Sequence, residues 1–137
     1  MPQNIYDDPT FFAAYDRMRT HGIALAGALE EPAIRSLLPD VTGMSVLDLG
    51  CGTGVMSRWL IESGADQVTG GDVSELMLAK ASEHQDSRIR YIHKDAESLE
   101  FPEGSFDLVV SSLMFHYIDD LQPVLSSIRR WLKPGGQ

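Results

Sequence analysis

The chain has 137 residues, one cysteine and a formal net charge of −9. That charge disfavours a nucleic-acid surface and attachment to anionic membranes, because both need clustered Lys and Arg. A single cysteine excludes an intrachain disulfide, and no apolar run approaches the ~20 residues that span a bilayer. The N-terminus lacks the basic and apolar segments of a signal peptide. We therefore expect one cytoplasmic domain, with neither a nucleic acid nor a membrane as its partner.

The first forty residues have the pattern of a helical cap. Residues 8–19 place four large side chains on one helical face, namely Phe11, Phe12, Tyr15 and Met18. Residues 23–40 form a second helical run, which we expect to break or bend near Pro32 and to stop at Pro39. We assign residues 1–40 to this cap and residues 41–137 to the core of the same domain.

The rest of the chain alternates between strand and helix. Strand patterns occupy residues 45–49, 67–72, 89–93 and 106–112. Helical patterns follow at residues 54–64, 74–84 and 119–133, and residues 94–105 form a loop. Short links between alternating elements predict parallel strands with right-handed crossovers. Because the fourth strand is nearly all apolar, helices should cover both faces of the sheet. The pattern predicts a doubly wound α/β domain preceded by two helices.

The stretch "VLDLGCGTG" ends the first strand with Asp48 and continues with Gly50, Gly52 and Gly54. In open α/β sheets, ligands bind outside the carboxyl ends of the strands, where the strand order reverses. Glycine there allows a positive φ or a close approach to a ligand, and the next helix presents free N–H groups. The stretch is typical of a site for a nucleotide or another ligand with a polar tail.

Two familiar glycine motifs do not fit this stretch. A phosphate-binding loop of the NTPase type needs G-x-x-x-x-G-K-[ST], but no lysine follows Gly54. A dinucleotide fingerprint needs G-x-G-x-x-G, and counting from Gly50 gives Val55 at its third glycine. The remaining pattern is G-x-G-x-G preceded by an acid.

"VLDLGCGTG" closely resembles the first motif of the class I, Rossmann-like S-adenosylmethionine-dependent methyltransferases. "VTGGDVSELMLAKA", "IHKDAESLEFPEGSFDLVVSSLMFHYIDD" and "WLKPGG" resemble the later motifs in the same order, so the resemblance covers roughly residues 40–136. Small-molecule enzymes of the quinone-biosynthesis type are the most similar. The resemblance implies the spatial strand order three, two, one, four, with the family's last three strands following "LKPGG". It also implies S-adenosylmethionine as cofactor, S-adenosylhomocysteine as product and a small-molecule methyl acceptor.

The resemblance implies a role for the loop around the first motif. Gly50, Cys51, Gly52 and Gly54 would pack against the methionine part of the cofactor, with Cys51 as a small turn residue. Asp48 would bind the ammonium group or hold the amides of the loop. The alternative for Asp48 is a cap of the next helix.

Further roles follow at the ends of the second and third strands. Asp72 would accept hydrogen bonds from both ribose hydroxyls, as acids do in dinucleotide folds. Val73 and Met77 would pack on the adenine, or belong to the helix–sheet core. Asp95 would bind the adenine amino group and the Ala96 amide a ring nitrogen; a solvated loop acid is the alternative for Asp95.

Three residues face the reacting end of the cofactor by the same resemblance. Ser111 would reach its ammonium group, and Tyr15 would meet its carboxylate or belong to the core. His116 lies after the fourth strand, where the sulfonium methyl should point. A catalytic base is needed only if the acceptor must lose a proton, and a structural histidine is the alternative. The other histidines lack ligand-like spacing, so we expect no metal.

The fourth strand would be an edge of the sheet, although its sequence reads like a central strand. Exposed apolar edges pair with other chains, so we expect a homo-oligomer formed through this edge. The alternative to an active enzyme is a catalytically silent S-adenosylmethionine-binding module or a fragment of a longer methyltransferase.

Overall fold

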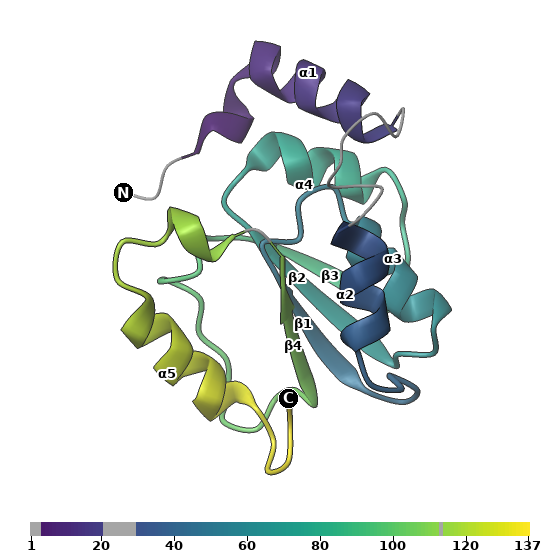
Figure 1. The fold of residues 1–137 in the computed structure, drawn as a ribbon, viewed down its shortest axis with the longest axis vertical. Helices are drawn as coiled ribbons and strands as arrows, with labels where there is room; N and C mark the ends of the chain where they lie inside the picture. Colours follow the sequence, from purple (N-terminus) through teal and green to yellow (C-terminus); the bar gives the residue numbers. More distant parts are fainter. Residues whose placement is uncertain (1–3, 21–29, 113) are drawn as a thin grey trace.

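A single parallel sheet forms the centre of the computed structural model, which describes residues 4–20, 30–112 and 114–137. Its strands are β1 (Ser45–Leu49), β2 (Gln67–Asp72), β3 (Ile89–His93) and β4 (Leu108–Ser111). They lie in the order β3-β2-β1-β4, and each neighbouring pair is parallel. The expected fold and strand order are therefore confirmed, with the strand order reversing between β1 and β4 (Figure 1).

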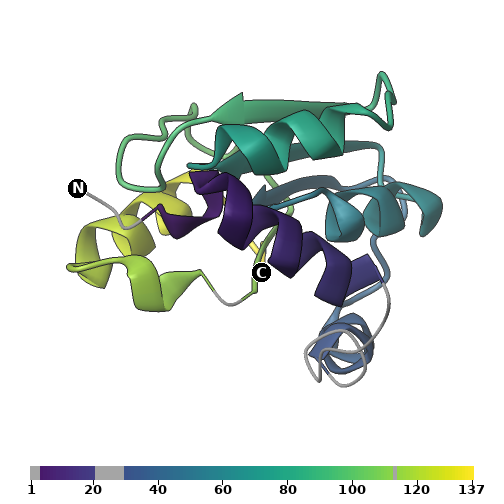
Figure 2. The ribbon, with the colours of Figure 1, turned by 90° about the horizontal axis from the view of Figure 1, so that it is seen from above.

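Helices lie on both faces of this sheet (Figure 1). The described helices are α1 (Pro9–Thr20), α2 (Glu31–Leu37), α3 (Val55–Glu62), α4 (Glu75–Ser82) and α5 (Leu121–Trp131). The short 3₁₀ helices η1 (Ile5–Asp7) and η3 (Phe115–Tyr117) precede α1 and α5. Seen from above, α1 crosses the carboxyl end of the sheet (Figure 2). None of the helices within the described residues has the length and apolar content needed to cross a membrane.

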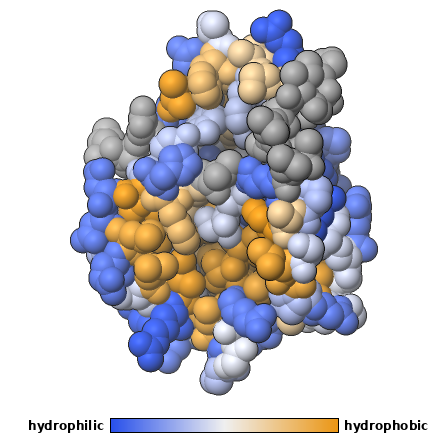
Figure 3. Space-filling view, viewed as in Figure 1, coloured by the Kyte–Doolittle hydropathy of each residue, from blue (hydrophilic) through white to orange (hydrophobic). Residues whose placement is uncertain are grey.

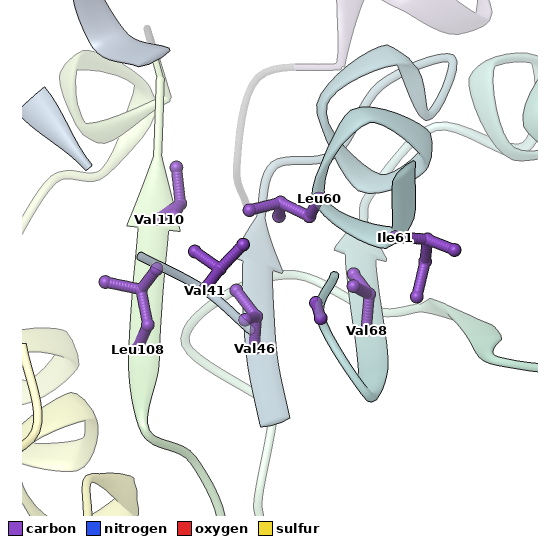
Figure 4. Packing of buried hydrophobic residues seen from close by; sticks show 8 residues of the cluster. Val41, Val46, Leu60, Ile61, Val68, Leu108 and Val110 are labelled. Carbon is purple, nitrogen blue, oxygen red and sulfur yellow. The ribbon is translucent and has the colours of Figure 1, made fainter. Parts of the chain in front are cut away.

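Alternating strand residues divide the apolar core into two clusters. Val46 of β1 faces α3, where it packs with neighbours from β2, β4 and α3 (Figure 4). The next residue, Leu47, faces the opposite side and packs with Val124 and Trp131 of α5. This alternation is the period-2 geometry of a strand covered on both faces.

The fourth strand is shorter than the predicted 106–112. Phe106 does not extend it, because its N–H donates to the Trp131 carbonyl at 3.0 Å and its carbonyl accepts from the Lys133 amide at 2.8 Å. Phe106 instead forms an isolated parallel bridge with Leu132, after α5. The hydrophobic pattern predicted Phe106 as strand, whereas its backbone partners lie outside the sheet.

The described part of the second helical run begins close to Pro32. Pro32 lies in the first turn of α2, a position that tolerates the missing N–H. The helix ends before Pro39, as expected. The earlier part of the predicted run, residues 23–29, lies outside the described residues.

Candidate cofactor site

A cavity of about 260 Å³ lies at the carboxyl end of the strands. Its walls come from the loop after β1, the ends of β2 and β4, the loop after β3, and residues of η1, α1 and α2. These segments are far apart in the sequence and meet where the strand order reverses. The position is therefore the one at which open α/β sheets bind ligands.

The glycine loop, residues 50–54, needs its glycines for two reasons. Gly50, Gly52 and Gly54 all have positive φ, at 78°, 55° and 80°, a conformation that L side chains rarely adopt. A Cβ on Gly50 would also lie 2.6 Å from Cγ of Met114. The amides of Gly50 and Cys51 donate to the Gly71 carbonyl at 2.8 and 3.0 Å, which holds the loop against β2.

Asp48 connects β1 to the helix that follows the loop. Its side chain is only 3% exposed, and it accepts a 2.7 Å hydrogen bond from the hydroxyl of Ser57 in the first turn of α3. Burial raises the pKa of Asp48 to about 6; the Ser57 hydrogen bond opposes this rise and the charge of Asp72 adds to it. Asp48 also lines the cavity. The hydrogen bond to Ser57 fits the alternative role of Asp48, a cap of the next helix. Contact of Asp48 with the cofactor stays a prediction.

Asp72 holds two backbone segments of the site at once. One carboxylate oxygen accepts from the Gly52 amide at 2.8 Å and the other from the Ser74 amide at 2.9 Å. Burial raises its pKa, although these hydrogen bonds oppose the shift. Each oxygen retains lone-pair capacity beyond the amide it accepts. The two hydrogen bonds fix the position of Asp72. Because Asp72 also lines the cavity, its carboxylate can accept further hydrogen bonds there.

The residues predicted to contact the adenine lie at the same cavity. Val73, Met77, Asp95 and Ala96 line it. Met77 is buried in the first turn of α4, and its amide donates to the Ser74 hydroxyl. Asp95 accepts from the amide and the hydroxyl of Ser98 at 2.8 and 2.9 Å, so its loop is ordered by its own side chain.

Three predicted site residues do not line the cavity. Gly54 is the N-cap of α3 and lies at the far end of the glycine loop. The hydroxyl of Ser111 donates to the Leu49 carbonyl at 3.0 Å and so joins β4 to β1, while contact of Ser111 with the cofactor stays a prediction. His116 lies in η3, where its ring packs 4.1 Å from that of Tyr117. Tyr117 lines the cavity and His116 does not, so a catalytic role for His116 stays a prediction.

Sequence reasoning missed the residues that cover the cavity. Tyr6 and Tyr117 both line it, and their hydroxyls lie 2.9 Å apart. The ring of Tyr6 also packs edge-on against the predicted Tyr15, with centroids 5.2 Å apart. Burial and the Tyr117 hydrogen bond raise the pKa of Tyr6 well above its ordinary value. On another side of the cavity, Glu30 accepts a hydrogen bond from the Ser112 hydroxyl. No sequence signal pairs residues so far apart.

Asp7 joins η1 to the start of α4. Its carboxylate accepts from the Ser74 hydroxyl at 2.6 Å and from the Leu76 amide at 3.1 Å. Although burial raises the pKa of Asp7, these hydrogen bonds hold it below its ordinary value. Asp7 was not predicted either, because it precedes the first helix and belongs to no recognisable motif.

Metal ligands are not gathered in the described part of the chain. There, no three His, Cys, Asp or Glu side chains come together in a way that would hold an ion. The expectation of a metal-free site stays a prediction.

Comparison with known proteins gives a matching family model and several similar proteins. A family model described as a methyltransferase domain matches residues 46–136. An uncharacterised protein of Haemophilus influenzae is 39% identical over 97% of this chain and 55% of its own length. The malonyl-[acyl-carrier protein] O-methyltransferase of Enterobacter lignolyticus is 38% identical over 76% of this chain and 41% of its own length.

Solved structures of methyltransferases share the fold. An S-adenosylmethionine-dependent methyltransferase from Mesorhizobium loti has a TM-score of 0.77 at 45% identity, covering 82% of this chain and 52% of that one. A Haemonchus contortus phosphoethanolamine N-methyltransferase, solved with S-adenosylhomocysteine, has a TM-score of 0.74 at 26% identity and covers 93% and 30%. The chain spans about half, or less, of the length of these relatives. With the family match over most of its length, it belongs to the class I, Rossmann-like S-adenosylmethionine-dependent methyltransferases.

Proposed function

We propose that this chain binds S-adenosylmethionine for the transfer of its methyl group to a small-molecule acceptor, with S-adenosylhomocysteine as product. The observation that carries the proposal is the hydrogen bond between the glycine loop and Asp72. The Gly52 amide, in the loop after β1, donates to Asp72 at the end of β2, beside a cavity lined by both residues. This places a close-approach loop next to a fixed carboxylate, which suits a ligand with an amino-acid tail and a ribose.

The residues at the cavity fit this cofactor. The glycine loop leaves open space at Gly52, where an added Cβ would meet only the Met77 sulfur at 3.9 Å, and Gly52 lines the cavity at the predicted methionine end. Asp72 has acceptor capacity left for the ribose hydroxyls, and Asp95, which follows the neighbouring strand β3 and also lines the cavity, would bind the adenine amino group. The Ala96 amide would donate to a ring nitrogen.

The bound cofactor supplies a methyl group activated on a sulfonium. The chain's own contribution is to align the donor and to exclude water from it. Tyr6, Tyr15 and Tyr117 form the wall that separates the cavity from solvent on the side of the N-terminus. His116, next to Tyr117, is our candidate for an acceptor-side base.

The acceptor is a small molecule in this proposal. The Enterobacter lignolyticus relative acts, by its name, on malonyl-[acyl-carrier protein], and the Haemonchus contortus enzyme was solved with phosphoethanolamine. These different acceptors are bound by relatives about two to three times longer than this chain. The alternative function, a silent cofactor-binding module or a fragment of a longer enzyme, is favoured by the same difference in length.

We also propose self-association through the β4 side, in a cytoplasmic setting. β4 is an edge of the sheet, and apolar atoms gather over it between α5 and α2 (Figure 3). Leu37 of α2 is 83% exposed and Leu125 of α5 is 42% exposed. Gln137 already pairs with the first part of the edge, through Asp107 and Val109. The rest of the edge is the surface proposed to meet a second copy, and sedimentation of a monomer at high concentration would contradict this.

Isothermal titration of S-adenosylmethionine and S-adenosylhomocysteine tests the function. Asp72→Asn should weaken binding of both by about tenfold or more, because hydrogen bonds to a charged carboxylate are lost. The matched control is Asp66→Asn, an exposed acid just before the same strand, which should bind like the wild type. Circular dichroism checks that each variant is folded. A folded wild type that binds neither ligand would refute the proposal for this chain.

A further inference from the structure

The cover over the cavity, residues 4–18, is held firmly at one side. Asp7 accepts hydrogen bonds from Ser74 and Leu76, and the Asn4 amide group donates to the Val73 carbonyl at 3.1 Å. Further along the cover, Asp16 lies 3.5 Å from the Lys80 ammonium of α4. All these partners belong to α4 or to the short segment that precedes it. This side of the cover is therefore anchored beside Asp72, because the Asp72 carboxylate accepts a hydrogen bond from the backbone amide of the same Ser74.

The opposite side of the cover is held differently. There Tyr6 of η1 meets Tyr117 of η3, a residue 111 positions later in the chain, through their hydroxyls. Their rings pack edge-on, with centroids 6.0 Å apart. Since η1 is anchored on α4 and η3 follows β4, this contact joins two segments of the cavity wall that are held by different parts of the fold.

The two attachments differ in strength. The anchor consists of several hydrogen bonds, two of them to an ionised carboxylate, and such bonds are roughly twice as strong as neutral ones. The tyrosine contact is one neutral hydrogen bond between two hydroxyls. When the cover moves, the tyrosine contact should separate first while the anchor stays in place.

We propose that Tyr6 and Tyr117 are positioning residues that control cofactor exchange: their hydrogen bond closes the cover, and its opening lets S-adenosylmethionine enter and S-adenosylhomocysteine leave. This inference rests on the proposed function, because it takes the cavity to hold that cofactor. The pair acts on the rate of exchange by holding the cover and takes no part in the chemical step.

The test uses variants that keep both aromatic rings. Tyr6→Phe, Tyr117→Phe and the double variant remove only the hydroxyls. Each is loaded with radiolabelled S-adenosylhomocysteine, and its release is followed after adding excess unlabelled ligand. Each single variant should release the ligand about threefold to tenfold faster, the range for loss of one neutral hydrogen bond. The double variant should be no faster than the faster single variant, because all three lack the same bond.

Ser105→Ala is the control. It removes a hydroxyl that donates to the Pro102 carbonyl, at the amino end of β4 and away from the cavity, and it should release the ligand at the wild-type rate. Melting temperatures distinguish control of exchange from a purely structural role of the tyrosine hydroxyls. A purely structural role would lower the melting temperature of the variants without changing the rate at which they release S-adenosylhomocysteine. Unchanged release in both single variants, or effects that multiply in the double variant, would overturn the proposal.

Hydrogen exchange distinguishes failure of this inference from failure of the proposed function. If the folded wild type binds no S-adenosylhomocysteine, the proposed function fails, but the cover can still be examined. Both tyrosine variants should then exchange residues 5–18 severalfold faster, with unchanged exchange in β1 and β2. Equal exchange of residues 5–18 in wild type and variants would refute an opening controlled by this pair.

Discussion

The glycine loop and the cover form opposite sides of one cavity but are built in different ways. The loop is fixed by backbone geometry: positive φ angles, amides bound to Gly71, and Asp72 accepting from Gly52. The cover is fixed by side chains, through Asp7 on one side and Tyr6 on the other. A backbone-determined wall has little freedom to move, whereas a wall held by a few side chains can open. The comparison suggests a division of tasks within one site: the glycine loop sets the geometry of binding, and the cover sets access to the cavity.

The largest effect is expected where the loop has no room to yield. Gly50→Ala adds a Cβ at a φ of 78° and within 2.6 Å of Met114 Cγ. Backbone strain and overpacking together should cost about 2–4 kcal/mol in the free energy of unfolding. Gly43→Ala isolates the strain, because Gly43 has a φ of 75° but nothing within 4 Å of its added Cβ. Urea unfolding should show a loss of only about 1 kcal/mol there; equal losses would mean that the loop can rearrange.

The next effect concerns the buried acid beneath the loop. Burial raises the pKa of Asp48 to about 6, whereas the unfolded chain releases this proton near pH 4. Stability from this group is therefore complete below about pH 4 and is lost as pH rises through 6. The loss should be about 3 kcal/mol.

Asp48→Asn removes this dependence while keeping a partner for Ser57. Unfolding free energies measured from pH 4 to 7 should therefore diverge, with the variant gaining on the wild type as pH rises. Asp66→Asn, at an exposed position, should track the wild type. Parallel curves for wild type and Asp48→Asn would show that Asp48 does not titrate in this window.

The smallest effect is expected in the cover. Asp7→Asn weakens the charged hydrogen bonds to Ser74 and Leu76, and because Asp7 is partly exposed the loss should be about 1 kcal/mol. Hydrogen exchange should rise in residues 5–18 while β1 and α3 remain protected. Ser36→Ala, which removes an exposed hydroxyl on α2, provides the control. Equal loosening of β1 would contradict the separation between loop and cover.

The parts of this molecule that sequence could predict are those encoded locally. The apolar runs predicted the strands, and the spacing of Gly50, Gly52 and Gly54 predicted a loop that only glycine can form. Asp72 was found because it ends a strand at a fixed distance from that loop. In each case the signal lies within a few residues of the feature it predicts, and the family resemblance then supplied a role.

The rest depends on contacts between distant segments. Tyr6 meets Tyr117 across 111 positions, and Phe106 leaves its strand to pair with the chain after α5. The Ser111 hydroxyl donates to Leu49 of the neighbouring strand, a contact that the sequence pattern does not predict. Such choices are decided by which partner is nearest in three dimensions. Hydrophobic periodicity carries no information about that.

Ser74 is the N-cap of α4, and its contacts extend beyond that helix. It is fully buried, its hydroxyl donates to Asp7 and accepts from the Met77 amide, and its own amide is bound by Asp72. This position thus needs a short side chain that is donor and acceptor at once, which alanine and an ionised aspartate are not. Asp72, the start of α4 and the N-terminal segment are therefore all hydrogen-bonded to Ser74. Any change at this position is therefore felt in all three.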